Sequence, residues 1–170
     1  MGCGSCENSK RVRSPGKDHD AGFPDMLILG CGNRQRGDDG AGILAAERLR
    51  ALGIAAEVCS GEPSELMAAW SGVQDVTLID AVVTGASAGA VHVWDGQHLP
   101  VFATSAASTH GLGVAQAIAL ARALDRLPVR LRVYGIEGKQ FEIGSPVSPQ
   151  VARAVEEVVN RIAIELRPAK

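Results

Sequence analysis

Aromatic residues are scarce in this chain of 170 residues, since Phe, Trp and Tyr together make up only 4% of the sequence. The core must therefore be built from Leu, Ile, Val and Ala, as is common in buried parallel sheets. Neither sign of charge dominates, because the formal net charge is -2 at pH 7. This balance argues against partners recruited by bulk charge, so we expect no nucleic acid and no membrane surface among the partners.

Long apolar segments are absent as well. No apolar run approaches the ~18 residues that a membrane-spanning helix needs, and no apolar stretch at the N-terminus indicates a secretory signal. We therefore expect a cytoplasmic protein. In that compartment the four cysteines, Cys3, Cys6, Cys31 and Cys59, are expected to stay reduced.

Residues 1–25 differ in composition from the rest of the chain. They are rich in Gly, Ser, Pro, Lys and Asp and have almost no apolar periodicity, which predicts a flexible N-terminal tail. The Cys3-Gly-Ser-Cys6 sequence could form a redox pair or half of a zinc site, but a full zinc site needs four ligands and no second CxxC is present. We interpret this segment as an inert tail, followed by a single α/β domain at 26–170.

From Met26 onward, apolar periodicity predicts alternating strands and helices. The expected strands are 26–32, 56–61, 76–82, 90–94 and 129–137. The expected helices are 40–52, a short one from Pro63, 111–127 and a last one from Ser148-Pro149. This alternation predicts a mostly parallel, twisted sheet of about five strands with helices on both faces. The 76–94 region resembles a hairpin, which we expect to add an antiparallel edge.

A glycine-rich stretch follows the first expected strand, from Gly30-Cys31-Gly32-Asn33 to Asp38-Asp39-Gly40-Ala41-Gly42. It is not a dinucleotide fingerprint, because Gln35 occupies the third glycine position of GxGxxG, and it is not a P-loop, because no Gly-Lys-Ser/Thr follows. Two adjacent acids would also repel a phosphate. Either acid could simply cap the following helix, but a cap does not need both.

Two more polar residues are predicted at the same edge of the sheet. Asp80 interrupts the apolar run 76–82 near its C-terminal end, where an acid is costly unless it is paired or faces a cleft, although it could also hold a neighbouring loop amide. His110 precedes the helix expected at 111–127. Because sites in open α/β sheets form at the carboxyl ends of the strands, we predict that Asp39, Asp80 and His110 form one site.

The residue types of this predicted site leave two kinds of chemistry open. Two carboxylates and an imidazole suit a divalent metal ion such as zinc or nickel, and they could equally bind and activate water directly. No GxSxG elbow is present. We expect the other two histidines of the folded region, His92 and His98, to be surface residues.

The segments GCGNRQRGDDGAG, LIDAV and STHGLG, in this order and spacing, resemble those of the hydrogenase maturation endopeptidases. Gly135-Ile136-Glu137 followed by Ser148-Pro149 is similar to the C-terminal pattern of that family, so the resemblance covers about residues 26–166. It implies a three-layer α/β fold of the phosphorylase/hydrolase-like kind. It also implies a peptidase, often classed as aspartic-type, that removes the C-terminal extension of the nickel–iron hydrogenase large-subunit precursor after nickel insertion.

The resemblance further implies roles for individual residues. Asp39, Asp80 and His110 would be the catalytic and metal-contacting residues, and Asp38, Asn33 and Gly40 would support them. Asp39 is one methylene shorter than the Glu that many relatives carry at this position. The metal would be nickel carried by the precursor, and a tightly held cofactor is not implied.

Two other functions fit the same residues. One is a non-catalytic, nickel-sensing chaperone of the precursor, and the other is a peptidase of the same fold that acts on another precursor. Loops 83–89 and 138–147 are expected to govern substrate choice, because their Gly, Ser and Pro residues allow variation. Arg34, Arg36 and Lys139 could contact the precursor, and we expect a monomer.

Overall fold

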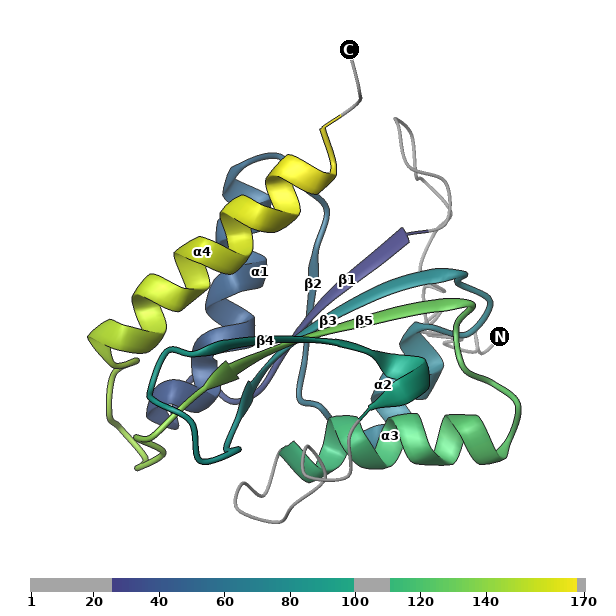
Figure 1. Ribbon diagram of the computed structural model, residues 1–170, viewed down its shortest axis with the longest axis horizontal. Coiled ribbons are helices and arrows are strands. Elements are labelled where there is room, and N and C mark those ends of the chain that lie inside the picture. The colour runs from purple at the N-terminus through teal and green to yellow at the C-terminus, as the bar shows by residue number, and fades with distance from the viewer. Residues whose placement is uncertain (1–25, 100–110, 168–170) are drawn as a thin grey trace, which may run out of the picture.

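The computed structural model describes residues 26–99 and 111–167, which form one sheet with helices packed against it (Figure 1). The tail predicted at 1–25, with its CxxC, and the candidate residue His110 lie outside the described residues. The strands are β1 (Met26–Cys31), β2 (Glu57–Cys59), β3 (Asp75–Val82), β4 (Val91–Asp95) and β5 (Arg130–Glu137).

The strands follow the order β2-β1-β3-β5-β4 across the sheet. β1 runs parallel to β2 and to β3, and β3 runs parallel to β5. Among the strands of the described residues, β4 alone is antiparallel to its neighbour, β5. The predicted five-stranded, mostly parallel sheet with an antiparallel edge is therefore confirmed.

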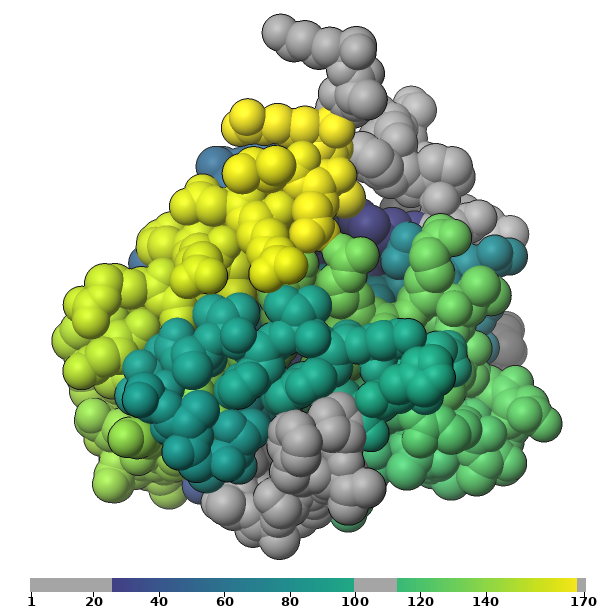
Figure 2. Space-filling view, viewed as in Figure 1, coloured from purple at the N-terminus to yellow at the C-terminus, as the bar shows by residue number. Residues whose placement is uncertain are grey.

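The hairpin predicted over 76–94 is wrong, because β5 lies between β3 and β4. β3 is buried along most of its length and needs a strand on each side, which β1 and β5 provide. β4 is only half-buried and takes the edge position, where Val93 is opposite Tyr134 of β5. Figure 2 shows the teal segment that carries β4 on the surface of the molecule, between α4 and α3.

The helices are α1 (Ala41–Ala51), α2 (Pro63–Ala69), α3 (Gly111–Ala123) and α4 (Pro149–Glu165), with short 3-10 turns η1 (Gly37–Gly40) and η2 (Gly96–His98). α1 and α4 cover one face of the sheet, and α2 and α3 cover the other (Figure 1). The predicted three-layer arrangement is confirmed. Within the described residues, no helix combines the length and hydropathy needed to cross a membrane.

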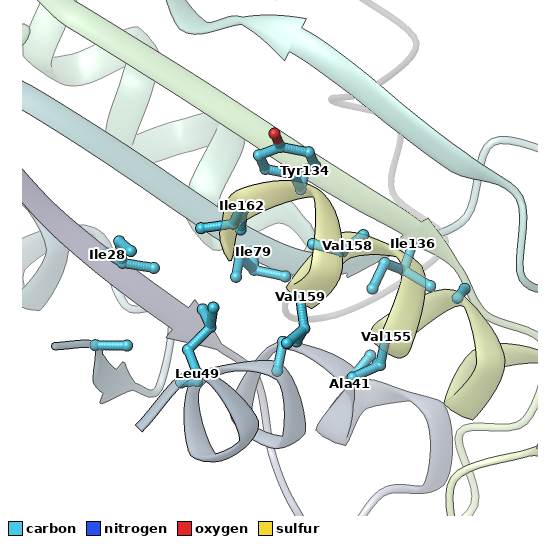
Figure 3. Close-up of a cluster of buried hydrophobic side chains, with 14 of the residues drawn as sticks. Ile28, Ala41, Leu49, Ile79, Tyr134, Ile136, Val155, Val158, Val159 and Ile162 are labelled. Atoms are coloured by element: carbon cyan, nitrogen blue, oxygen red, sulfur yellow. The ribbon is translucent and has the colours of Figure 1, made fainter. Parts of the chain in front are cut away.

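A valine-rich stripe holds α4 on the sheet (Figure 3). Its apolar residues recur at helical spacing and are all buried: Val151, Val155, Val158, Val159 and Ile162. They pack against Ile79 and Tyr134 in the layer between α4 and the sheet. This stripe supplies the aliphatic core that the scarcity of aromatics predicts.

The opposite face of the sheet carries the candidate site. Leu78 belongs to the core beneath α2 and α3, whereas Ile79 and Ala81 belong to the core beneath α1 and α4. Because successive side chains of a strand point to opposite faces, Asp80 shares the face of Leu78. The pleat of β3 therefore directs Asp80 toward the α2 and α3 layer.

Candidate active site

Asp80 lies near the carboxyl end of β3 and is 2% exposed. Its Oδ1 accepts a hydrogen bond from the backbone N–H of Ala81 at 2.9 Å. Burial raises the pKa of Asp80 to about 8, and the negative charge of Asp39 contributes in the same direction. The charge of Asp39 therefore reaches Asp80, and both burial and this charge favour the protonated form of Asp80. That the two acids act in one catalytic site stays a prediction.

Asp39 lies in η1 and is 1% exposed. The loop before it is folded by backbone hydrogen bonds, because Asn33 N–H donates to the Asp39 carbonyl and Asp39 N–H donates to the Arg36 carbonyl. The Asn33 side chain accepts a hydrogen bond from Gln35 N–H at 2.9 Å. Asn33 therefore shapes the loop that carries Asp39, and a catalytic role for Asp39 stays a prediction.

Two glycines allow this loop to approach the sheet. A Cβ added at Gly32, which has φ +129, would lie 1.9 Å from the Asp39 carbonyl oxygen. A Cβ at Gly42, in the first turn of α1, would lie 2.2 Å from the Ile79 carbonyl oxygen and 2.3 Å from that of Cys31. Gly42 thus lets α1 begin directly against β1 and β3, which places Asp39 beside Asp80.

Asp38 has a different environment from Asp39. Its carboxylate accepts backbone hydrogen bonds from Lys139 at 2.9 Å, Gln140 at 3.0 Å and Ser148 at 2.7 Å. Burial alone would raise the pKa of Asp38, but these N–H donors outweigh burial and lower it. Asp38 therefore ties loop 138–147 to the candidate site.

The helix-cap interpretation of Asp38 and Asp39 is wrong. Gly40 occupies the N-cap position of α1, and no side chain forms a capping hydrogen bond there. The acids precede this position because η1 is inserted between the loop and α1. A Cβ at Gly40 would lie 3.4 Å from its nearest neighbour, an ordinary contact, so space alone does not require glycine there. A supporting role for Gly40 stays a prediction.

The chain next to His110 reaches the same edge of the sheet. α3 begins at Gly111, and a Cβ added at Gly113 would lie 2.2 Å from the Gly61 carbonyl oxygen. Gly61 follows β2, so the first turn of α3 packs at the carboxyl end of that strand. This position of α3 is consistent with the predicted site, while the place of His110 stays a prediction.

Glu137 is a buried carboxylate to which sequence reasoning gave no role. It is 1% exposed at the end of β5, and it accepts hydrogen bonds from the N–H and hydroxyl of Thr84 and from Gly85 N–H, all at 2.9 Å. It thereby fixes the start of loop 83–89. The signal that identified Asp80, an acid ending an apolar strand, is present at Glu137 too.

The two histidines expected at the surface, His92 and His98, differ in how far their side chains are exposed. His98 is confirmed as a surface residue, with 84% of its side chain exposed. His92 is half-buried: it stacks on Trp94, and its Nε2 lies 3.6 Å from Glu137 Oε2. The alternating pattern of β4 did not reveal this contact, because Glu137 is distant in sequence.

The described residues contain no group of three or more His, Cys, Asp or Glu side chains that could hold a metal ion. Asp39 and Asp80 are two of the three predicted ligands, and the third, His110, lies outside the described residues. Of the residues proposed to contact the precursor, Arg34 forms an exposed ion pair with Glu47.

Two hollows lie at opposite ends of the strands. A cleft of about 370 Å³ opens beside the site, lined by Gly32, Asn33, Val58, Cys59, Ser60 and Glu65 among others. A larger cavity of about 660 Å³ is lined by Met26, Asp75 and Arg130, the first residues of β1, β3 and β5. The smaller cleft is therefore the one next to the predicted active-site loop.

Residues 61–165 match the sequence profile of a family described as hydrogenase maturation protease. The matched range contains Asp80 and His110, whereas Asp39 precedes it. The chain is 24% identical over 148 residues to the hydrogenase 2 maturation protease of Escherichia coli, with 84% of this chain and 90% of the relative covered.

Solved structures are similar in fold. The [NiFe] hydrogenase maturation protease HybD from Thermococcus kodakarensis has a TM-score of 0.65 and 26% identity, covering 85% of this chain and 100% of that chain. The hydrogenase maturating endopeptidase HybD from Escherichia coli has a TM-score of 0.71 and 22% identity, covering 85% and 93%. Together with the profile match over residues 61–165, these similarities establish that the chain belongs to the hydrogenase maturation protease family and is a peptidase.

Proposed function

We propose that this peptidase removes the C-terminal extension of the large-subunit precursor of a nickel–iron hydrogenase after nickel insertion. The observation that carries the proposal is the buried pair of Asp39 and Asp80 at the carboxyl edge of the sheet. The relative from Thermococcus kodakarensis, which bears [NiFe] hydrogenase in its name, supports this choice of substrate.

Two buried carboxylates in mutual repulsion favour a cation between them. The charge of Asp39 helps to raise the pKa of Asp80, so a bound divalent ion would relieve the repulsion and displace the Asp80 proton. Oxygen and imidazole ligands suit nickel, and in this proposal the ion is part of the substrate. Asp39, Asp80 and His110 would contact nickel already bound to the precursor and so position the extension.

The same pair of acids can assist hydrolysis. Cleavage of a peptide bond by water needs a group that accepts a proton from the water and a donor for the leaving amine. Once the nickel of the precursor has displaced the Asp80 proton, the site offers carboxylates that can accept a proton from the attacking water. Nickel on the precursor would make cleavage a checkpoint, because a precursor without nickel lacks the group that docks. A cytoplasmic location and a monomeric state stay predictions.

The experiment compares purified precursor with and without bound nickel. Each form is incubated with the protein, and the intact mass of the precursor is followed with time. We expect the nickel-loaded precursor to lose its C-terminal extension and the nickel-free precursor to stay whole. Equal cleavage of both forms would contradict nickel recognition. A stable complex with no change in precursor mass would instead favour the nickel-sensing chaperone.

A further inference from the structure

Two cysteines face each other beside the candidate site. Cys31 ends β1 and Cys59 ends β2, and the two residues are register partners across these parallel strands. Cys59 Sγ lies 3.1 Å from Cys31 Sγ, and both are free thiols. The proposed chemistry of Asp39 and Asp80 uses neither thiol.

The backbone geometry is compatible with a disulfide. Neighbouring strands lie about 4.7–4.9 Å apart, and disulfide-linked residues have Cα atoms about 4.4–6.8 Å apart. Both side chains belong to the core beneath α2 and α3, so they point to the same face of the sheet. The sulfur atoms therefore need to approach by only about 1 Å to reach the S–S bond length of about 2.05 Å.

The two thiols differ in their access to solvent. Cys31 is 0% exposed, whereas Cys59 is 7% exposed and lines the cleft of about 370 Å³. A small oxidant that enters the cleft therefore meets Cys59 first. Cys31 lies directly behind Cys59, in position to react with it afterwards.

We propose that Cys31 and Cys59 are a redox-modification site that closes reversibly to a disulfide and lowers the peptidase activity. With hydrogen peroxide as oxidant, Cys59 sulfur bonds to one peroxide oxygen, the O–O bond breaks and water leaves, which gives a sulfenic acid. Cys31 sulfur then attacks Cys59 sulfur, the S–O bond breaks and a second water leaves. The two thiols lose two electrons to the peroxide, and a dithiol reductant returns them.

Tight backbone contacts connect this pair to Asp39. Gly32, the residue after Cys31, donates its N–H to the Cys59 carbonyl and lies against the Asp39 carbonyl. Gly42 packs directly on the backbone of Cys31, since an added Cβ there would lie 2.7 Å from Cys31 N. Any backbone adjustment at Cys31 or Cys59 that accompanies closure of the S–S bond would therefore be transmitted through both glycines to the loop that carries Asp39, and would move Asp39 relative to Asp80.

The test uses full-length protein with Cys3→Ser and Cys6→Ser, because Cys31 and Cys59 are then its only thiols. The protein is treated with hydrogen peroxide, and its mass, its peptide map and its cleavage of nickel-loaded precursor are measured before and after addition of dithiothreitol. We expect the loss of two hydrogens and a linked peptide joining Cys31 and Cys59. Cleavage should fall about tenfold or more, because a misplacement of about 1 Å can cost about a hundredfold, and dithiothreitol should restore it.

The matched control adds Cys59→Ala to the same background. This variant should keep its activity in peroxide, which separates disulfide formation from oxidative damage elsewhere. Any of three results would overturn the proposal. The thiols stay reduced in peroxide, the oxidation is not reversed by dithiothreitol, or the disulfide forms and leaves cleavage of the precursor unchanged. The activity readout rests on the proposed function. If the reduced protein does not cleave the precursor, that function fails, while mass and peptide map still decide whether the disulfide forms.

Discussion

At the scale of single residues, hydrogen-bond donors decide what each buried carboxylate does. Asp38 accepts three backbone N–H groups, and Glu137 accepts two together with a hydroxyl. Among the described residues, Asp80 accepts one backbone N–H and has Asp39 nearby. The first two acids therefore hold loops, and the N–H donors lower the pKa of Asp38, whereas burial raises the pKa of Asp80 to about 8.

The raised pKa of Asp80 predicts a particular dependence of stability on pH. Between the unfolded pKa near 3.8 and the folded pKa of about 8, the folded protein binds the Asp80 proton and the unfolded chain does not. The free energy of unfolding should therefore fall as pH rises through this window, by at most about 1.4 kcal/mol per unit. Denaturant unfolding of the metal-free protein from pH 5 to 8 measures this slope.

Asp80→Asn is the matched variant, because it removes the titrating group at nearly constant shape. Its stability should change less between pH 5 and 8 than that of the wild type. The lowered pKa of Asp38 acts in the opposite direction, but its stabilisation is lost only as pH falls below the ordinary range of an aspartate. Identical slopes in wild type and variant would show that Asp80 is ionised throughout.

The hydrogen bonds of Glu137 predict that its replacement destabilises the protein and loosens the start of loop 83–89. In the wild type, the donors of Thr84 and Gly85 share the two carboxylate oxygens of Glu137. Glu137→Gln leaves these donors a single acceptor oxygen, so we expect a loss of about 1–3 kcal/mol in stability. The amides of Thr84 and Gly85, which donate to Glu137, should exchange hydrogen faster in this variant. Glu142→Gln, at an exposed residue, is the control. Unchanged exchange at both amides would mean that Glu137 does not hold loop 83–89.

At the scale of the elements, the start of α1 against the sheet is the decisive contact. Gly42 allows this contact because a Cβ there would clash with the backbones of Ile79 and Cys31. Gly42→Ala should therefore destabilise the protein by about 1–3 kcal/mol or more, because backbone cannot yield as a flexible side chain can. Thermal unfolding measures the change.

Gly40→Ala provides the comparison two residues away. The added Cβ has room, and Gly40 already has helical backbone angles. The free energy of unfolding of the Gly40→Ala protein should therefore change little or rise by about 0.4–1 kcal/mol. Equal losses in the two variants would argue against a specific close approach at Gly42.

Most elements could be predicted from apolar periodicity, and their ends differ from prediction by a few residues. The helix expected at 40–52 is α1, and the helix starting at Ser148-Pro149 is α4. The partner of β4 could not be predicted, because its alternating pattern shows only that one face is buried. β4 pairs with β5 because the buried strand β3 already has β1 and β5 as its two neighbours, and this arrangement is a property of the whole sheet.

At the scale of the whole molecule, the parallel sheet gathers residues that lie far apart in sequence. Asp39 and Asp80 could be predicted together, because each follows or ends a strand of the same sheet. The roles of Asp38 and Glu137 could not, because their partners near residues 84, 140 and 148 lie 53 to 110 positions away. The Cys31–Cys59 contact likewise depends on the register of β1 and β2.

The most direct test of the account is the intact mass of nickel-loaded precursor after incubation with Asp80→Asn. This variant should fold, because it replaces a buried acid with a neutral side chain of the same shape. Asp75→Asn, at the other end of β3, is its control. We predict that the wild type and Asp75→Asn remove the C-terminal extension and that Asp80→Asn leaves the precursor whole. Removal of the extension by Asp80→Asn at the wild-type rate would contradict the central claim that the buried acid pair is the active site.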